Sequence, residues 1–192
     1  MYQARIYGTS ECNMSLVTRQ NAANKDHAIC YVEQHLNSFN ASANHGMALI
    51  ALNGSMRSLK WANNYCILLQ SAMKGLISFA HPKRLASGER GGSCIKYTNM
   101  PAILTEPLFV SNPSHVTFLR TGGVRVLAQV LANSIMSTFP DGGLVALSIG
   151  HGYRGKLDAG APVVGAIGDE CETYYNEKII IATAEILQKG GA

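Results

Sequence analysis

Short apolar segments that alternate with longer amphipathic ones constrain the fold of this 192-residue chain most strongly. Residues 46–52, 102–106 and 144–149 are apolar along nearly their whole length, as in strands that are buried on both faces of a sheet. Apolar residues recur at helical spacing over residues 59–76 and 124–135. The alternation predicts one α/β domain over residues 1–192, a three-layer sandwich with a mostly parallel or mixed sheet and helices on both faces.

The rest of the chain fits this frame. Residues 2–7 and 28–36 read as further strands, and residues 14–24 and 172–188 read as helices. The basic, glycine-containing stretch 80–100 is predicted to be an irregular surface loop that borders a site. The chain shows no internal repeat and no low-complexity linker that would mark a domain boundary.

Composition narrows the classes of protein further. An apolar fraction of 47% with 15% charged residues indicates a globular chain. A net charge of +4 either favours approach to an anionic surface such as a bacterial wall or reflects an ordinary soluble surface with a few extra lysines. Nucleic-acid binding is not expected, because basic and aromatic residues are not interleaved. Five cysteines without a C-x-x-C pair argue against a zinc finger or a disulfide framework. The sequence contains no run of about 18 apolar residues, so membrane insertion is not expected.

Ionisable residues follow three of the predicted strands. They are His35, Glu106 and His151, and Glu172 begins the last predicted helix. In open α/β sheets, functional groups gather where strands end. Two histidines and one carboxylate, with water as the fourth ligand, form a known catalytic zinc set. The pattern suggests a Zn2+ site, although a histidine at a strand end is also a common hydrogen-bonded structural residue.

The closing third of the chain carries a more specific pattern. Gly150-His151-Gly152 is followed by Asp158 to Ala161 and then by Glu172, with Asn176 four residues later. This order resembles the opening block of the zinc-dependent N-acetylmuramoyl-L-alanine amidases of type 3, in which a histidine and a following glutamate are metal ligands.

Two other segments resemble the same family. Residues 31–38 are similar to its second histidine segment, a strand ending in His-x-Asn, and Arg19, Ala23 and Asn24 match the approach to it. Residues 100–113 are similar to the block that contains the catalytic glutamate. The resemblance implies that His35, His151 and Glu172 bind Zn2+, that Glu106 is catalytic, and that peptidoglycan is cleaved between N-acetylmuramic acid and L-alanine.

The order of these blocks differs from that of the family, because the block that opens the family's domain closes this chain. A circular permutation explains the difference: the family's first strand and helix would correspond to residues 144–188. In the usual order, residues 186–192 would then run directly into residues 2–8. The hypothesis predicts that the two termini lie close together.

Several assignments have alternatives. Glu170 competes with Glu172 as the metal ligand, because the spacing from His151 is longer than is usual in the family. Glu33 lies two residues before His35 and therefore on the same face of the strand, either as a partner that orients His35 or as an ordinary hydrogen-bonded carboxylate. The remaining histidines are expected to be solvated, with His45 and His81 as weak candidates for lining the groove: His27, His45, His81 and His115. Three basic residues of the loop region are candidates to meet acidic groups of a wall peptide: Arg84, Arg90 and Lys96.

The resemblance also suggests a biological setting. The N-terminus lacks the apolar stretch of a signal peptide, so we expect a protein that is made in the cytoplasm and reaches the wall through a separate lysis protein, as a phage endolysin does. We also expect a monomer. One alternative is a zinc carboxypeptidase-like hydrolase of wall peptides. Another is a catalytically silent wall-binding protein with the same fold, which would have no need of Glu106.

Overall fold

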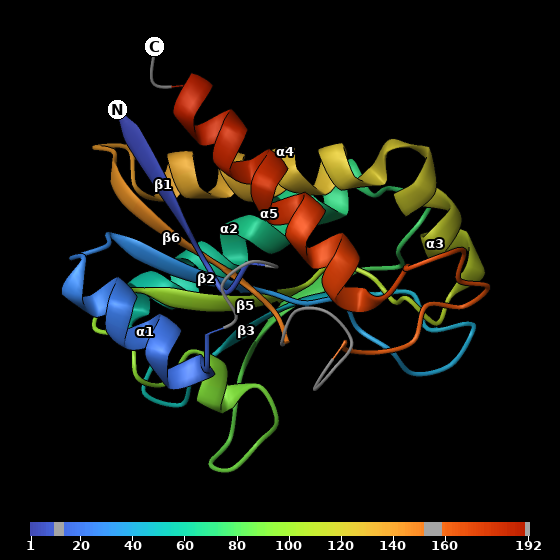
Figure 1. The fold of residues 1–192 in the computed structure, drawn as a ribbon, viewed down its shortest axis with the longest axis horizontal. Helices are drawn as coiled ribbons and strands as arrows, with labels where there is room; N and C mark the ends of the chain where they lie inside the picture. The colour runs from blue at the N-terminus through green and yellow to red at the C-terminus, as the bar shows by residue number, and fades with distance from the viewer. Residues whose placement is uncertain (10–13, 152–158, 191–192) are drawn as a thin grey trace.

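A six-stranded mixed sheet lies at the centre of the computed structural model, which describes residues 1–9, 14–151 and 159–190 (Figure 1). Its strands are β1 (Tyr2–Tyr7), β2 (Cys30–Gln34), β3 (Gly46–Ile50), β4 (Ala80–Arg84), β5 (Ala102–Glu106) and β6 (Gly143–Ile149). They lie in the order β1-β6-β2-β5-β3-β4, and every neighbouring pair is parallel except β3 with β5. This arrangement confirms the predicted fold class.

Helices cover both faces of the sheet (Figure 1). The helical elements of the described residues are α1 (Leu16–Lys25), α2 (Met56–Ala72), η1 (Gly92–Cys94), α3 (Pro113–Phe118), η2 (Leu119–Gly123), α4 (Val124–Thr138) and α5 (Glu172–Lys189). Helices α2, α4 and α5 pack on one face, and α1 with η1 packs on the other. None of the described helices is both long enough and apolar enough to span a bilayer.

Each face has its own apolar core. The larger core lies under α2, α4 and α5, and it includes Trp61, whose Nε1 donates to Ser134 Oγ at 3.0 Å. The smaller core lies under α1 and contains Ala23, Tyr31 and Leu104. Burial of these side chains on both faces explains why the central strands are apolar along their length.

The prediction of an irregular loop over residues 80–100 was wrong for its first five residues. Ala80–Arg84 form strand β4, which pairs in parallel with β3 from Gly46↔Ala80 to Ile50↔Arg84. Strand β4 is at the edge of the sheet and partly exposed, so it does not need an apolar run. Pro82 has no backbone N–H to donate, which an edge strand tolerates on the side where no other strand pairs with it. Its sequence therefore lacks the usual signs of a strand.

The topology brings the predicted site residues to one edge of the sheet. Strands β6, β2 and β5 are neighbours and run in the same direction, with Gln34 opposite both Ile149 and Thr105. Their carboxyl ends therefore meet at one edge, as expected for a binding site in an open α/β sheet.

Candidate functional site

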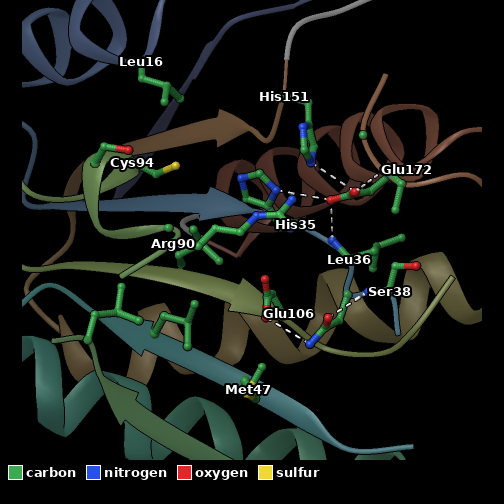
Figure 2. A pocket seen from close by; sticks show the side chains of 18 of the residues that line it. Leu16, His35, Leu36, Ser38, Met47, Arg90, Cys94, Glu106, His151 and Glu172 are labelled. Carbon is green, nitrogen blue, oxygen red and sulfur yellow. Dashed lines mark hydrogen bonds and ion pairs between the residues drawn. The ribbon is translucent and has the colours of Figure 1, made fainter. Parts of the chain in front are cut away.

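His35, His151 and Glu172 converge at this edge of the sheet (Figure 2). His35 directly follows β2, His151 lies two residues after β6, and Glu172 is the first residue of α5. His35 Nδ1 lies 3.2 Å from Glu172 Oε1, and His151 Nε2 lies 3.0 Å from Glu172 Oε2. The two imidazole rings meet edge to face with their centroids 4.7 Å apart. One carboxylate therefore faces both imidazole rings.

Backbone donors hold the Glu172 carboxylate in place. Leu36 N donates to Oε1 at 3.0 Å, and Ala161 N donates to Oε2 at 2.8 Å. Gly160 allows this close approach: it has φ +77°, and a Cβ there would lie 2.6 Å from Oε2. Burial by itself would raise the pKa of Glu172, but hydrogen bonds with His151 and His35 outweigh it and hold the pKa well below its usual range. The carboxylate is therefore ionised at neutral pH.

His151 has an unusual backbone conformation. Its φ is +69°, in the left-handed region that non-glycine residues rarely adopt. Residues in such conformations persist where the surrounding structure enforces them, and they cluster at functional sites. The conformation turns the chain sharply after β6 and directs the imidazole toward Glu172, as Figure 2 shows.

The three side chains suit a zinc ion. They offer nitrogen and carboxylate oxygen donors that all lie within 4.8 Å of one another. Zinc bonds of about 2.0–2.2 Å in tetrahedral geometry place neighbouring donors about 3.3 Å apart. The observed separations of 3.0 and 3.2 Å are close to this value. Because the set has two imidazoles and one ionised carboxylate, it fits the metal that the sequence suggested.

Glu106 lies next to this cluster, at the end of β5. Its Oε2 accepts a hydrogen bond from Asn37 Nδ2 at 3.1 Å. Burial raises the pKa of Glu106, and the electrostatic effect of the nearby His35 opposes the shift. Glu106 and the three clustered residues line one cavity of about 1050 Å³ (Figure 2). No role was predicted for Asn37, although it is the asparagine of the His-x-Asn segment.

Glu170, the rival of Glu172, is engaged elsewhere. Arg120 Nε donates to its Oε1 at 3.0 Å, and the Tyr175 hydroxyl donates to the same oxygen. The hydrogen bonds from Arg120 and Tyr175 lower the pKa of Glu170 to about 2. The geometry thus favours Glu172 as the carboxylate that faces the histidines.

A second group of possible donors consists of Glu33, His35 and Cys94. Glu33 already accepts hydrogen bonds from Arg19 and Tyr31. Burial raises the pKa of the Cys94 thiol to about 12, so it stays protonated, whereas a metal ligand must be a thiolate. This group therefore does not suit a metal ion.

The remaining predicted residues differ in their outcome. The expectation of a solvated His115 was wrong: it is buried, its Nδ1 accepts from Phe109 N at 3.0 Å, and its Nε2 faces the carbonyl of Leu76. His45 packs against Phe79 rather than into the cavity. Arg84 donates to backbone carbonyls, whereas Arg90 lines the cavity. Gly152 and Asp158, which belong to the segment that resembles the amidase family's opening block, lie outside the described residues.

Comparison with known proteins identifies the class. The family model for N-acetylmuramoyl-L-alanine amidases matches residues 1–137, so the chain belongs to this family of peptidoglycan hydrolases. The match confirms the resemblance seen in the sequence. No curated protein matches the chain.

Solved structures give the same fold. The catalytic domain of the amidase CwlV from Bacillus (Paenibacillus) polymyxa var. colistinus aligns with TM-score 0.56 and 22% identity, covering 67% of each chain. An N-acetylmuramoyl-L-alanine amidase from Clostridium difficile 630 aligns with TM-score 0.51 and 21% identity, covering 68% of this chain and 66% of the other. The catalytic domain of the CD27L endolysin, which targets Clostridia difficile, aligns with TM-score 0.51 and 17% identity over 64% of this chain and 62% of its own. The aligned part thus spans slightly less than two thirds of the last two chains, and at these identities the likeness establishes the fold alone.

Proposed function

We propose that this chain is a zinc-dependent enzyme that cleaves the amide bond between N-acetylmuramic acid and L-alanine in bacterial peptidoglycan. The observation that carries the proposal is the convergence of His35, His151 and Glu172 beside Glu106 in one cavity. Membership of the amidase family supports the choice of bond.

The mechanism assigns a role to each side chain. His35, His151 and Glu172 would hold the ion, which when bound would supply Lewis-acid chemistry by polarising the scissile carbonyl and lowering the pKa of a water molecule. Glu106 takes a proton from the attacking water and delivers it to the leaving amine of L-alanine. Asn37 donates to Glu106 Oε2, which fixes the carboxylate and leaves Oε1 for proton transfer. The C–N bond breaks, and the products are a lactyl carboxylic acid and a free amine.

Analysis of the products released from purified peptidoglycan tests this function against its main alternative. The amidase releases intact stem peptides with a new L-alanine amino terminus, and the glycan strands remain uncut. Release of a single carboxyl-terminal amino acid would instead identify a wall carboxypeptidase. Binding to walls without any released product would identify the catalytically silent wall-binding protein.

The proposal extends to the biological setting. The likeness to the CD27L endolysin catalytic domain and the net charge of +4 support action on the bacterial wall as a lytic enzyme, in the manner of a phage endolysin. We expect a monomer that needs neither nucleic acid nor membrane insertion for activity. Purified protein added to isolated walls should therefore reduce their turbidity, and intact turbidity after addition of zinc-loaded protein would contradict the proposal.

The rotated order of the motifs is also part of the proposal: the domain is circularly permuted. The family match ends at residue 137, yet β6 lies inside the sheet, between β1 and β2. Residues near both ends of the described part of the chain reach Met136. The Tyr2 hydroxyl donates to the Met136 carbonyl at 3.3 Å, and a Cβ at Gly190 would lie 3.5 Å from Met136 Sδ. Figure 1 likewise draws the start of β1 beside the end of α5.

A reordered chain tests the permutation. Residues 143–192 placed before residues 1–142 are expected to fold with the same thermal stability to within a few degrees, because the new break falls in the tight turn at Asp141 and Gly142. Circular dichroism and zinc content should match those of the original chain. A reordered chain that stays unfolded would contradict the proposed correspondence.

Arg90 is the basic residue best placed to bind an acidic group of the stem peptide. It is exposed and lines the cavity, and Figure 2 shows its side chain pointing inward. Lys83, on the same wall, is paired with Glu89. Arg90 forms no ion pair with the described part of the chain, so its charge is available to a ligand.

Replacement of Arg90 by glutamine is therefore expected to raise KM about tenfold or more with a smaller change in kcat, as for loss of a charged hydrogen bond to substrate. Lys96→Gln is a control with the same change of charge, because Lys96 lines a different pocket and should leave both constants unchanged. Equal effects of the two substitutions would show that only net charge matters.

A further inference from the structure

A buried ion pair lies directly behind the histidines. Arg19 of α1 and Glu33 of β2 are 1% and 0% exposed, and Arg19 Nη1 lies 3.2 Å from Glu33 Oε1. Taking two charges out of water costs more than their attraction commonly returns, so such a pair is weak evidence for stability by itself. The contacts that Arg19 and Glu33 make therefore indicate whether the pair has a role other than stability.

The arginine end of the pair holds the segment that carries His151. Arg19 Nη2 donates to the carbonyl of His151 at 2.6 Å, and Nη1 donates to the carbonyl of Ile149 and lies 3.3 Å from Ser148 Oγ. Its guanidinium also lies against Gly8, which has φ +76° and where a Cβ would come within 2.5 Å of Arg19 Cζ. The planar guanidinium thus anchors the strained turn that aims His151 at Glu172.

The glutamate end of the pair faces His35. The Tyr31 hydroxyl donates to Glu33 Oε2 at 2.6 Å, while Oε1, which receives Arg19, lies 3.9 Å from His35 Nε2. Nε2 is buried and has no hydrogen-bond partner among the residues that the structure describes, whereas Nδ1 faces Glu172. When zinc is bound to Nδ1 in place of a proton, a carboxylate on the Nε2 side favours the tautomer with its proton on Nε2, which leaves the Nδ1 lone pair for the ion that His35 shares with Glu172.

We propose that Arg19 and Glu33 are a positioning pair for the metal site: Glu33 sets the tautomer of His35, and Arg19 fixes the backbone at His151. The inference rests on the proposed zinc function and deepens it. Arg19 and Glu33 lie within the matched residues 1–137, and the carbonyls that Arg19 binds lie beyond them. One buried pair therefore joins the two parts of the chain that supply the histidines.

Zinc affinity measured by competition with a chromogenic chelator tests the pair. Glu33→Gln removes the charge but keeps the size of the side chain, and it is expected to weaken zinc binding by about 10–100-fold, as for other carboxylates that contact a ligand histidine. Glu170→Gln is the matched control, because it removes a glutamate whose partners are Arg120 and Tyr175, and it should leave zinc affinity unchanged. Unchanged affinity in a folded Glu33→Gln protein would overturn the inference.

A measurement on the wild-type protein does not depend on a variant that folds. In the zinc-loaded full chain, 15N NMR of His35 is expected to show a protonated Nε2 and a metal-bound Nδ1. A proton on Nδ1 with metal on Nε2 would overturn the role of Glu33. Wild-type protein that binds no zinc would instead overturn the proposed function together with this inference, so the two failures are distinguishable.

Discussion

Glu106→Gln is expected to lower kcat by about 10²–10⁴-fold while zinc content stays at one ion per chain. Glutamine has nearly the same shape and keeps an oxygen that can accept from Asn37 Nδ2, but it cannot take a proton from water. Because Glu106 is outside the group of three clustered donors, the metal site should be intact. The measurement combines zinc analysis with the rate of stem-peptide release.

A second variant separates the role of the Glu106 carboxylate from that of its hydrogen-bond donor. Asn37→Ala is a second variant, which keeps the Glu106 carboxylate but removes its donor, and it should reduce kcat by a smaller factor than Glu106→Gln does. Full activity of Glu106→Gln would refute the assigned role. Loss of zinc in that variant would show instead that Glu106 belongs to the metal site.

His35→Ala and His151→Ala are each expected to lose zinc and to abolish turnover. Each removes one of three donors that lie within 4.8 Å of one another. Without the ion, the pKa of the attacking water returns from about 7 to about 15.7, so hydrolysis at neutral pH falls below detection. Metal analysis after dialysis and the peptide-release assay measure the two effects.

Removal and return of metal in the wild-type protein is the control for these variants. Chelation should stop activity and added zinc should restore it, because the donors remain in place. The alanine variants should not respond to added zinc at concentrations that restore the wild-type protein. Stoichiometric zinc in either variant would contradict the ligand set.

The sequence predicted the fold well where burial produces a pattern. Strands β3, β5 and β6 are buried and apolar, and the helical spacing of α2 and α4 reflects the faces they turn to the core. Strand β4 escaped prediction because an edge strand is stabilised by pairing with β3 rather than by burial. His115 was misjudged for a similar reason: its buried nitrogens are satisfied by the backbone of distant residues, which a local polar context does not reveal.

The site residues also divide into those that local sequence reveals and those that depend on tertiary contacts. Local motifs and strand ends identified His35, Glu106, His151 and Glu172 as candidates, and the parallel neighbours β6, β2 and β5 bring the strand-end residues together. The Arg19–Glu33 pair was not predicted, because it joins a helix and a strand whose contact depends on tertiary structure. The choice of Glu172 over Glu170 likewise required the position of Arg120, which is 50 residues away in sequence.

Zinc anomalous diffraction from crystals of the zinc-loaded protein tests the central claim most directly. We expect one zinc peak, bound by His35 Nδ1, His151 Nε2 and the Glu172 carboxylate, with Glu106 facing the open coordination position. A peak at any other group of residues, or no peak in protein that cleaves peptidoglycan, would contradict it.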